Sequence, residues 1–298
     1  MPHLSDERVV TYDVSDGVAT VALARPEKGN AWRWDMCEQL EEVFDAADRD
    51  DAARVVLVVG EGKHFSVGMD LDAVDTLAAP GRPTIDGHIR DSAGRVTLKM
   101  MSLRKPIVVA MHGAAIGVGT TLTLAGDIRI AGESARFGLP FTRLGIVPEG
   151  TSTWLLPRIV GLAQALEWII TGRTFDAAEA LRGGLVSRVV PDAELRDTAL
   201  GLAREIAATT SPTALAHTRQ LVWRMLGATS PWEAHRLESA FLEAAAKGPD
   251  CREAAAAFKE KRAPVFNPEV AEWPGAPRTR WPEVPPGITV VPTSHDRS

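Results

Sequence analysis

The chain has 298 residues, a formal net charge of −6 at pH 7, and a hydrophobic content of 45%. The length allows one large domain or two, and the composition is that of a globular protein with a sizeable core. The acidic balance gives no support for binding to nucleic acid or to an anionic membrane surface. No apolar stretch approaches the roughly 20 residues that span a bilayer.

The start of the chain and its cysteines indicate a compartment. Residues 1–13 are polar and lack the charged-then-apolar order of a signal peptide. The chain has two cysteines, Cys37 and Cys251, which do not form the spacing of a metal site. We therefore expect a cytoplasmic protein with two separate reduced thiols and no bound metal.

The first half of the chain alternates strands and helices. Residues 9–12 and 18–23 predict two short strands joined by a turn at Asp16-Gly17. Hydrophobic spacing then predicts, in chain order, a helix over 34–47, a buried strand over 54–59, a mobile stretch over 72–86, a helix over 88–103, a buried strand over 106–111, a short helix over 121–125 and a strand over 127–131. This order implies right-handed crossovers and strands that are buried on both faces.

The second half is predominantly helical. The pattern predicts helices over 154–159, 163–170, 177–181, 195–208, 212–226, 231–246 and 250–262, interrupted by one strand over 185–190. After Phe266 the chain is rich in proline and carries Trp273 and Trp281, so we expect this tail to be irregular.

Two glycine-containing loops follow buried strands, at residues 65–71 and 112–121. Glycine lets a backbone turn so that an amide N–H faces a ligand, and free N–H groups at a helix start favour negative charge. Neither loop has the spacing of a dinucleotide fingerprint or a P-loop, and close helix–sheet packing explains either loop taken alone. Together the loops could direct two N–H donors at one carbonyl oxygen, which is an oxyanion hole.

In six ordered segments the chain resembles the crotonase (enoyl-CoA hydratase/isomerase) family. These segments are RPEKGNA at 25–31, FSVGMDL at 65–71, the loop and helix start at 112–127, the stretch 135–148, residues 178–186 and FKEKR at 258–262. The resemblance implies an α/β crotonase (ClpP/crotonase-like) fold, with repeated ββα units that form a spiral core. It implies three regions: a core with the active site (1–200), a C-terminal helical region for trimerisation and CoA contact (201–266), and the Pro-rich tail (267–298).

The same resemblance assigns residues to the site. It places the oxyanion amides at Met69 and Val118. It assigns contacts with an acyl-CoA substrate to Lys28, Ser66, Val67, Gly68, Asp70, Gly117, Thr121, Phe141, Phe258 and Lys261. The last two would meet CoA across a subunit interface, and Lys28 is equally consistent with a solvated surface lysine. Coenzyme A enters as part of the substrate, with no tightly bound cofactor, and the resemblance implies a homotrimer or a dimer of trimers.

The position of the carboxylates indicates the reaction. Hydratases of the family use two glutamates to deprotonate a water, and Thr121 and Phe141 occupy those positions here. Neither side chain is a useful general base. Glu149 lies in a PEG segment that resembles the Δ3,Δ2-enoyl-CoA isomerases of the family, in which this glutamate shuttles a proton. Burial would raise its pKa to a useful value. The alternative is that Glu149 caps a helix that begins near Ser152.

Three functions remain open at this point. The first is an enoyl-CoA isomerase with Glu149 as base and acid. The second is a hydratase in which Glu149 activates water, alone or with Thr121 positioning it. The third is a non-catalytic acyl-CoA-binding scaffold. We expect Asp70 and Asp127 to orient backbone, and His64, His88 and His112 to be structural.

Overall fold

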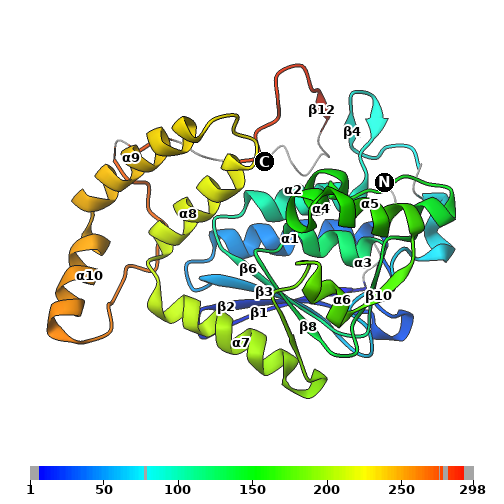
Figure 1. Ribbon diagram of the computed structural model, residues 1–298, viewed down its shortest axis with the longest axis horizontal. Coiled ribbons are helices and arrows are strands. Elements are labelled where there is room, and N and C mark those ends of the chain that lie inside the picture. The colour runs from blue at the N-terminus through cyan, green and yellow to red at the C-terminus, as the bar shows by residue number, and fades with distance from the viewer. Residues whose placement is uncertain (1–6, 77–78, 275, 278–280, 292–298) are drawn as a thin grey trace.

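The main sheet has six strands in the order β1-β2-β3-β6-β8-β11 (Figure 1). The computed structural model describes residues 7–76, 79–274, 276–277 and 281–291. Strands β1 (Val10–Ser15) and β2 (Val18–Leu23) pair antiparallel, whereas β3 (Val55–Gly60), β6 (Ile107–Met111), β8 (Ile128–Gly132) and β11 (Arg188–Val190) continue the sheet in parallel. The predicted hairpin and the predicted parallel strands are confirmed.

Helices cover both faces of this sheet. All six residues of β3 are buried. Val56 and Val58 pack in the core cluster that contains α1 (Trp34–Arg49) and α2 (Ser92–Ser102). Val55 and Leu57 pack against α7 (Asp192–Thr209) on the opposite face. Burial on both faces explains why these strands are continuous apolar runs without polar alternation.

A second, small sheet carries the loops of interest. It has the order β10-β9-β7, formed by Thr174–Asp176, Arg136–Gly138 and Ala114–Ile116. Directly after β7 come α3 (Val118–Thr121) and the 3-10 helix η3 (Leu122–Ala125). These three strands were not predicted, because three residues are too few to show an alternating pattern.

The C-terminal half is helical, as predicted. Its helices are α4 (Ser152–Val160), α5 (Leu162–Thr171), α6 (Ala177–Arg182), α8 (Pro212–Met225), α9 (Pro231–Lys247) and α10 (Pro249–Glu260). Helix α7 runs without a break across residue 200, and α8, α9 and α10 extend away from the sheet (Figure 1). Within the described residues no helix is both long and apolar enough to cross a membrane.

Two predictions about the loop and the tail were wrong. The helix predicted from residue 88 begins at Ser92, because β4 (Thr84–Ile85) and β5 (His88–Ile89) form a small hairpin before it. The tail after Phe266 is not wholly irregular, since β12 (Val290–Val291) pairs antiparallel with β4. This pairing joins segments about two hundred residues apart, so local sequence could not reveal it. The predicted mobile stretch contains η2 (Leu71–Thr76) and β4, and its residues 77–78 lie outside the described part.

Candidate active site

The two glycine-containing loops lie against each other. The Ser66 amide donates to the Ala114 carbonyl at 2.9 Å, and the Ile116 amide donates to the Ser66 carbonyl at 3.0 Å. Each loop then turns at a glycine with positive φ, 98° at Gly68 and 55° at Gly117. A Cβ on Gly117 would lie 4.0 Å from the Gly68 Cα, and a Cβ on Gly68 would lie 2.9 Å from the Ile116 oxygen. Glycine therefore permits both the turns and their close approach.

These turns present two amide groups. Val118 is the first residue of α3, and the N–H groups in the first turn of a helix have no intrahelical acceptor. Met69 lies between Gly68, whose carbonyl accepts from Trp32, and Asp70, whose amide donates to the Trp32 carbonyl. Across the described residues, neither the Met69 nor the Val118 N–H has a protein acceptor. Each of the two adjacent turns therefore carries one amide without a protein acceptor.

Glu149 lies beside the last residue of α3. The Thr121 hydroxyl donates to a Glu149 carboxylate oxygen at 2.7 Å. The Glu149 side chain is half-buried, and desolvation among protein atoms raises its pKa to about 8, against a lowering effect of the Thr121 hydrogen bond. The helix-cap alternative is excluded, because Thr151 is the N-cap of α4 and Glu149 offers only its backbone oxygen, to the Ser152 hydroxyl at 2.6 Å.

The structure adds a second carboxylate, Asp91, that the sequence analysis missed. Asp91 is the N-cap of α2, where its side chain accepts from the Gly94 amide. The same carboxylate accepts from the Gly150 amide at 3.2 Å, next to Glu149 in the chain. Its charge and its hydrogen bond with Glu149 both raise the Glu149 pKa further. The N-cap preference of aspartate could have predicted its position on α2, but the neighbourhood of Glu149 arises only from tertiary packing.

The loop that contains Lys28, a predicted contact of acyl-CoA, holds a buried ion pair. Arg25 and Asp70 are both buried, and their charged atoms lie 2.5 Å apart. Asp70 also accepts from the Asp72 amide at 3.1 Å, which confirms that it orients backbone. The Arg25 guanidinium is therefore occupied. Lys28, at the end of η1 (Pro26–Lys28), is exposed and lies 3.5 Å from Asp72.

Replacing Asp70 by asparagine is expected to lower the free energy of unfolding by about 3 kcal/mol, because it leaves the buried Arg25 charge without its partner. The hydrogen bond from Arg25 lowers the pKa of Asp70 below its ordinary value of 3.8. The Arg25–Asp70 pair therefore stabilises the fold fully above pH 3.8. This stabilisation is lost as the pH falls through the lowered pKa of Asp70. Urea unfolding at several pH values measures both effects. The matched control is Asp72→Asn, which removes an exposed pair and should change almost nothing; equal losses would contradict the assignment.

The remaining predicted residues divide into two groups. Ser66, within the loop at 65–71, and Phe141, in the 3-10 helix η4 (Pro140–Leu144), are both buried, and the Ser66 hydroxyl donates to the Asn30 carbonyl at 2.8 Å. Phe258 and Lys261 belong to the end of α10, which Figure 1 shows at the left edge of the molecule and well away from α4. Phe258 is 86% exposed. A single chain therefore does not bring these two residues to Glu149.

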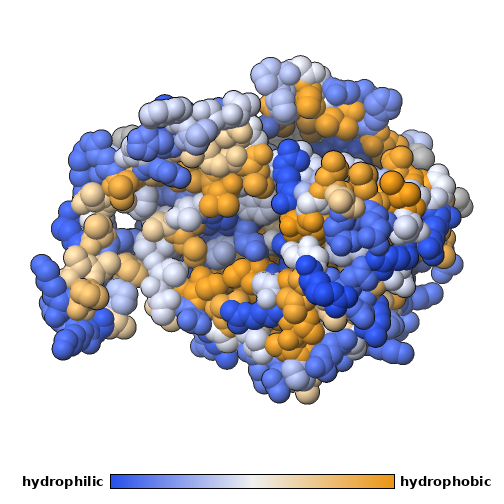
Figure 2. Space-filling view, viewed as in Figure 1, coloured by the Kyte–Doolittle hydropathy of each residue, from blue (hydrophilic) through white to orange (hydrophobic). Residues whose placement is uncertain are grey.

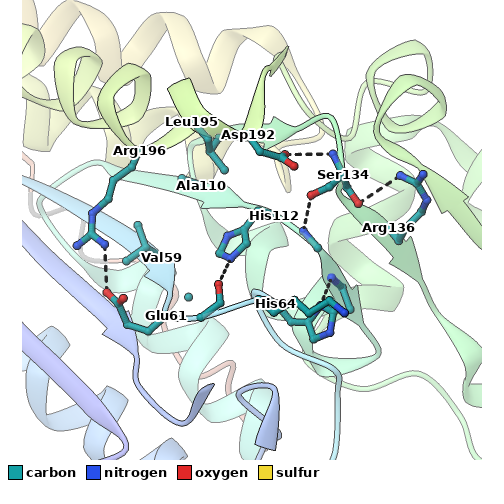
Figure 3. Close-up of a pocket in the computed structure, with 15 residues that line it drawn as sticks. Val59, Glu61, His64, Ala110, His112, Ser134, Arg136, Asp192, Leu195 and Arg196 are labelled. Atoms are coloured by element: carbon teal, nitrogen blue, oxygen red, sulfur yellow. Dashed lines mark hydrogen bonds and ion pairs between the residues drawn. The ribbon is translucent and has the colours of Figure 1, made fainter. Parts of the chain in front are cut away.

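A separate cavity of about 640 Å³ lies at the carboxyl ends of β3 and β6, beside the start of α7 (Figure 3). It contains none of the predicted site residues. Its histidines hold backbone in place: His64 Nδ1 accepts from the Ala114 amide at 3.1 Å, and His112 Nε2 lies 2.8 Å from the Gly62 carbonyl. The prediction that these histidines are structural is confirmed. A half-buried aspartate elsewhere also holds backbone in place, since Asp127 accepts from the Ile107 amide at 2.7 Å.

Comparison with known proteins decides the family. A sequence model described as Enoyl-CoA hydratase/isomerase matches residues 13–269. The chain belongs to the enoyl-CoA hydratase/isomerase family. The predicted crotonase fold is thereby confirmed, and solved members share it. An enoyl-CoA hydratase from Bacillus anthracis superposes with a TM-score of 0.79 at 29% identity, over 88% of this chain and 100% of the other.

The names of similar proteins in the family give different activities. The enoyl-CoA hydratase ACTT3 of Alternaria alternata is 38% identical over 262 residues, which is 88% of this chain and 86% of that protein. The 1,2-epoxyphenylacetyl-CoA isomerase of Escherichia coli K12 is 35% identical over 254 residues, which is 85% of this chain and 96% of that protein. The family membership of this enzyme therefore leaves hydratase and isomerase chemistry to be decided from the site.

Proposed function

We propose that this enzyme is an enoyl-CoA isomerase that moves a double bond from the 3 to the 2 position of an acyl-CoA thioester. The observation that carries the proposal is Glu149, a half-buried carboxyl with a raised pKa that accepts a hydrogen bond from Thr121 in α3, the short helix that begins with the unpaired Val118 amide. Thr121 and Phe141 stand where the family's hydratases carry glutamates, so Glu149 is the candidate for proton transfer.

The reaction needs one carboxylate. The thioester oxygen binds the Met69 and Val118 N–H groups, and the Glu149 carboxylate removes a proton from C2 of the 3-enoyl thioester. The electrons of the broken C–H bond delocalise through the double bond onto the thioester oxygen, where the two N–H donors stabilise the negative charge. Glu149 then returns the same proton to C4. Atoms and charge balance, and the double bond has moved to C2–C3.

The pH dependence of the reaction is expected to report the Glu149 carboxyl. Because the base must be deprotonated and its pKa is raised to about 8, kcat/KM should increase with pH and level off above that value. In Asp91→Asn the rising part should move to lower pH, because a nearby charge and hydrogen bond that raise the pKa are gone. Initial rates across a pH series measure the shift. Glu133→Gln, an exposed site, is the control, and an unmoved Asp91→Asn profile would contradict this assignment.

A specific observation also supports a second candidate, hydration of a 2-enoyl-CoA. Asp91 places a second carboxylate next to Glu149, and two carboxyl groups could together orient a water molecule for attack at C3. Several similar proteins are also named hydratases. In this alternative Glu149 removes a proton from water, and the protein returns a proton to C2.

Product analysis separates the candidates. Purified enzyme is given a 3-enoyl-CoA and a 2-enoyl-CoA in separate reactions, and the products are resolved by chromatography with mass detection. Isomerisation gives a product of unchanged mass, whereas hydration adds one water. Fast hydration of the 2-enoyl-CoA without isomerisation of the 3-enoyl-CoA would reject the isomerase, and acyl-CoA binding without either product would favour the non-catalytic scaffold.

A further inference from the structure

The cavity beside the start of α7 has the size and the place in the sheet of a ligand site (Figure 3). Its volume of about 640 Å³ falls within the roughly 300–1,000 Å³ that is usual for small-molecule sites. It lies at the carboxyl ends of the parallel strands β3 and β6, the side on which α/β sheets commonly bind ligands. The proposed reaction uses none of the residues that line it, so the cavity is available for a separate role.

The walls of the cavity are held by hydrogen bonds between separate segments. The Gly113 amide donates to the Ser134 hydroxyl, and the Ser134 amide donates to the Asp192 carboxylate, each at 3.1 Å. His112 Nε2 lies 2.8 Å from the Gly62 carbonyl and so joins the end of β6 to the loop after β3. Because these bonds are internal to the protein, the walls keep their shape by themselves, and binding does not have to order them.

The cavity is apolar at one end and basic at the other. In Figure 3, Val59, Ala110 and Leu195 lie on one side of His112, and Arg136 lies on the other. The first three are buried aliphatic side chains. Over α7, Figure 2 shows apolar and strongly hydrophilic side chains next to each other. This division suits a ligand that has an apolar part and a charged part.

Two positive charges of the cavity have no acidic partner. The side chains of Lys63 and Arg136 line the cavity and are exposed. Across the described residues, neither of them pairs with a carboxylate. Both carboxylates of the lining are already engaged, since Glu61 lies 3.2 Å from Arg196 and Asp192 accepts from a backbone amide. A bound anion would therefore meet two cations for which no internal carboxylate competes.

His64 adds a hydrogen-bond donor of fixed position. Its Nδ1 accepts from the Ala114 amide at 3.1 Å, so Nδ1 carries no hydrogen. Burial, and to a lesser extent the charge of Lys63, lowers the pKa of His64, so the ring is neutral at pH 7 and its hydrogen is on Nε2. Within the described part of the chain this Nε2–H has no acceptor. Arg136 lies close by, because its amide donates to the carbonyl of Gly113, which directly precedes Ala114.

We propose that this cavity is a second binding site of the enzyme and that it takes a small organic anion. The phosphate or carboxylate group of the ligand lies against Lys63, His64 and Arg136. The apolar part of the ligand lies against the aliphatic side chains at the other end of the cavity. The inference uses neither Glu149 nor the oxyanion amides, so it does not rest on the proposed function.

The test is calorimetry with two probes, phenyl phosphate and benzoate, at a salt concentration of about 0.15 M, which screens attraction between distant exposed charges. At least one probe should bind, and the tighter one identifies phosphate or carboxylate as the preferred anionic group. Benzyl alcohol, which has the ring without the charge, and inorganic phosphate or acetate, which have the charge without the ring, should bind roughly tenfold more weakly or less.

Arg136→Ala and Lys63→Ala should each weaken binding of the tighter probe by roughly tenfold, because each removes a charge-assisted contact. The matched control is Arg49→Ala, at an exposed arginine that ends α1 outside the cavity, and it should leave binding unchanged. All three side chains are exposed, so each variant should fold. An equal loss in Arg49→Ala would show a general effect of charge and would overturn the inference.

Three further results would overturn it. Neither probe binds; the probe binds no better than the same anion without its ring; or butyryl-CoA displaces the probe, which would make the cavity part of the acyl-CoA site. Turnover of a 3-enoyl-CoA is assayed separately. Probe binding by a protein that converts no enoyl-CoA would reject only the proposed function, whereas turnover without probe binding would reject only the second site.

Discussion

Replacing Glu149 by glutamine is expected to reduce the turnover of a 3-enoyl-CoA by a factor of roughly 10² to 10⁴, which is the usual contribution of a positioned general acid–base group. The amide has nearly the shape of the carboxyl and can still accept from Thr121, whose hydroxyl lies 2.7 Å from the Glu149 oxygen. It cannot take a proton from C2 at any accessible pH. The decrease should therefore appear in kcat, with little change in binding of a saturated acyl-CoA.

The control for Glu149→Gln is the same substitution at Glu133, which is exposed and follows β8 directly. Stopped or continuous assays of the conjugated product measure both variants.

The pH dependence of stability separates a catalytic from a structural role of Glu149. Glutamine carries no charge, so Glu149→Gln should be slightly more stable than the wild type at alkaline pH, where the wild-type carboxyl must ionise although it is buried. Between the ordinary pKa of 4.5 and the raised value of about 8, wild-type stability should fall as pH rises. Full isomerase activity in Glu149→Gln would end the proposed mechanism.

Much of the fold could be predicted from the sequence because its signals are local. The apolar run of β3, the 3.6-residue period of α1 and the turn at Asp16-Gly17 each indicate one structure without reference to distant residues. The same holds for the oxyanion turns, where glycines follow buried strands. Elements that exist only through distant partners were missed, namely the second sheet and the pairing of β12 with β4.

The candidate site shows the same division. Glu149 could be singled out because it stands in a recognisable segment next to two substituted positions. Asp91 could not, since its relation to Glu149 depends on the Gly150 amide and on how α2 packs beside α4. Arg25 begins one of the segments that resemble the family, and Asp70, 45 residues further along, neutralises its charge in a buried pair. The electrostatic role of a charged side chain depends on its contacts with distant residues in the fold. The sequence alone does not show whether such a side chain already has a partner of opposite charge.

A proline at position 118 is expected to remove one oxyanion donor while preserving the fold, and to lower kcat by roughly 10² to 10³. Val118 is the first residue of α3, where proline is well tolerated because the N–H has no helical acceptor. The preceding residue is Gly117, which has no Cβ to meet the pyrrolidine ring. Steady-state kinetics on a 3-enoyl-CoA measure the loss. The melting temperature should stay close to that of the wild type.

The matched variant is Val118→Ala, which trims the buried side chain but retains the N–H. If the amide stabilises the enolate, proline should be far more damaging than alanine, and the decrease should lie in kcat rather than in affinity for a saturated acyl-CoA. A reduced affinity would instead indicate that the proline ring blocks the pocket. Equal losses in the two variants would assign position 118 to packing alone. Because charge on the thioester oxygen develops only during proton transfer, a donor aimed at that oxygen acts chiefly on the transition state, so the ratio of the two variants in kcat is the quantity that decides the point.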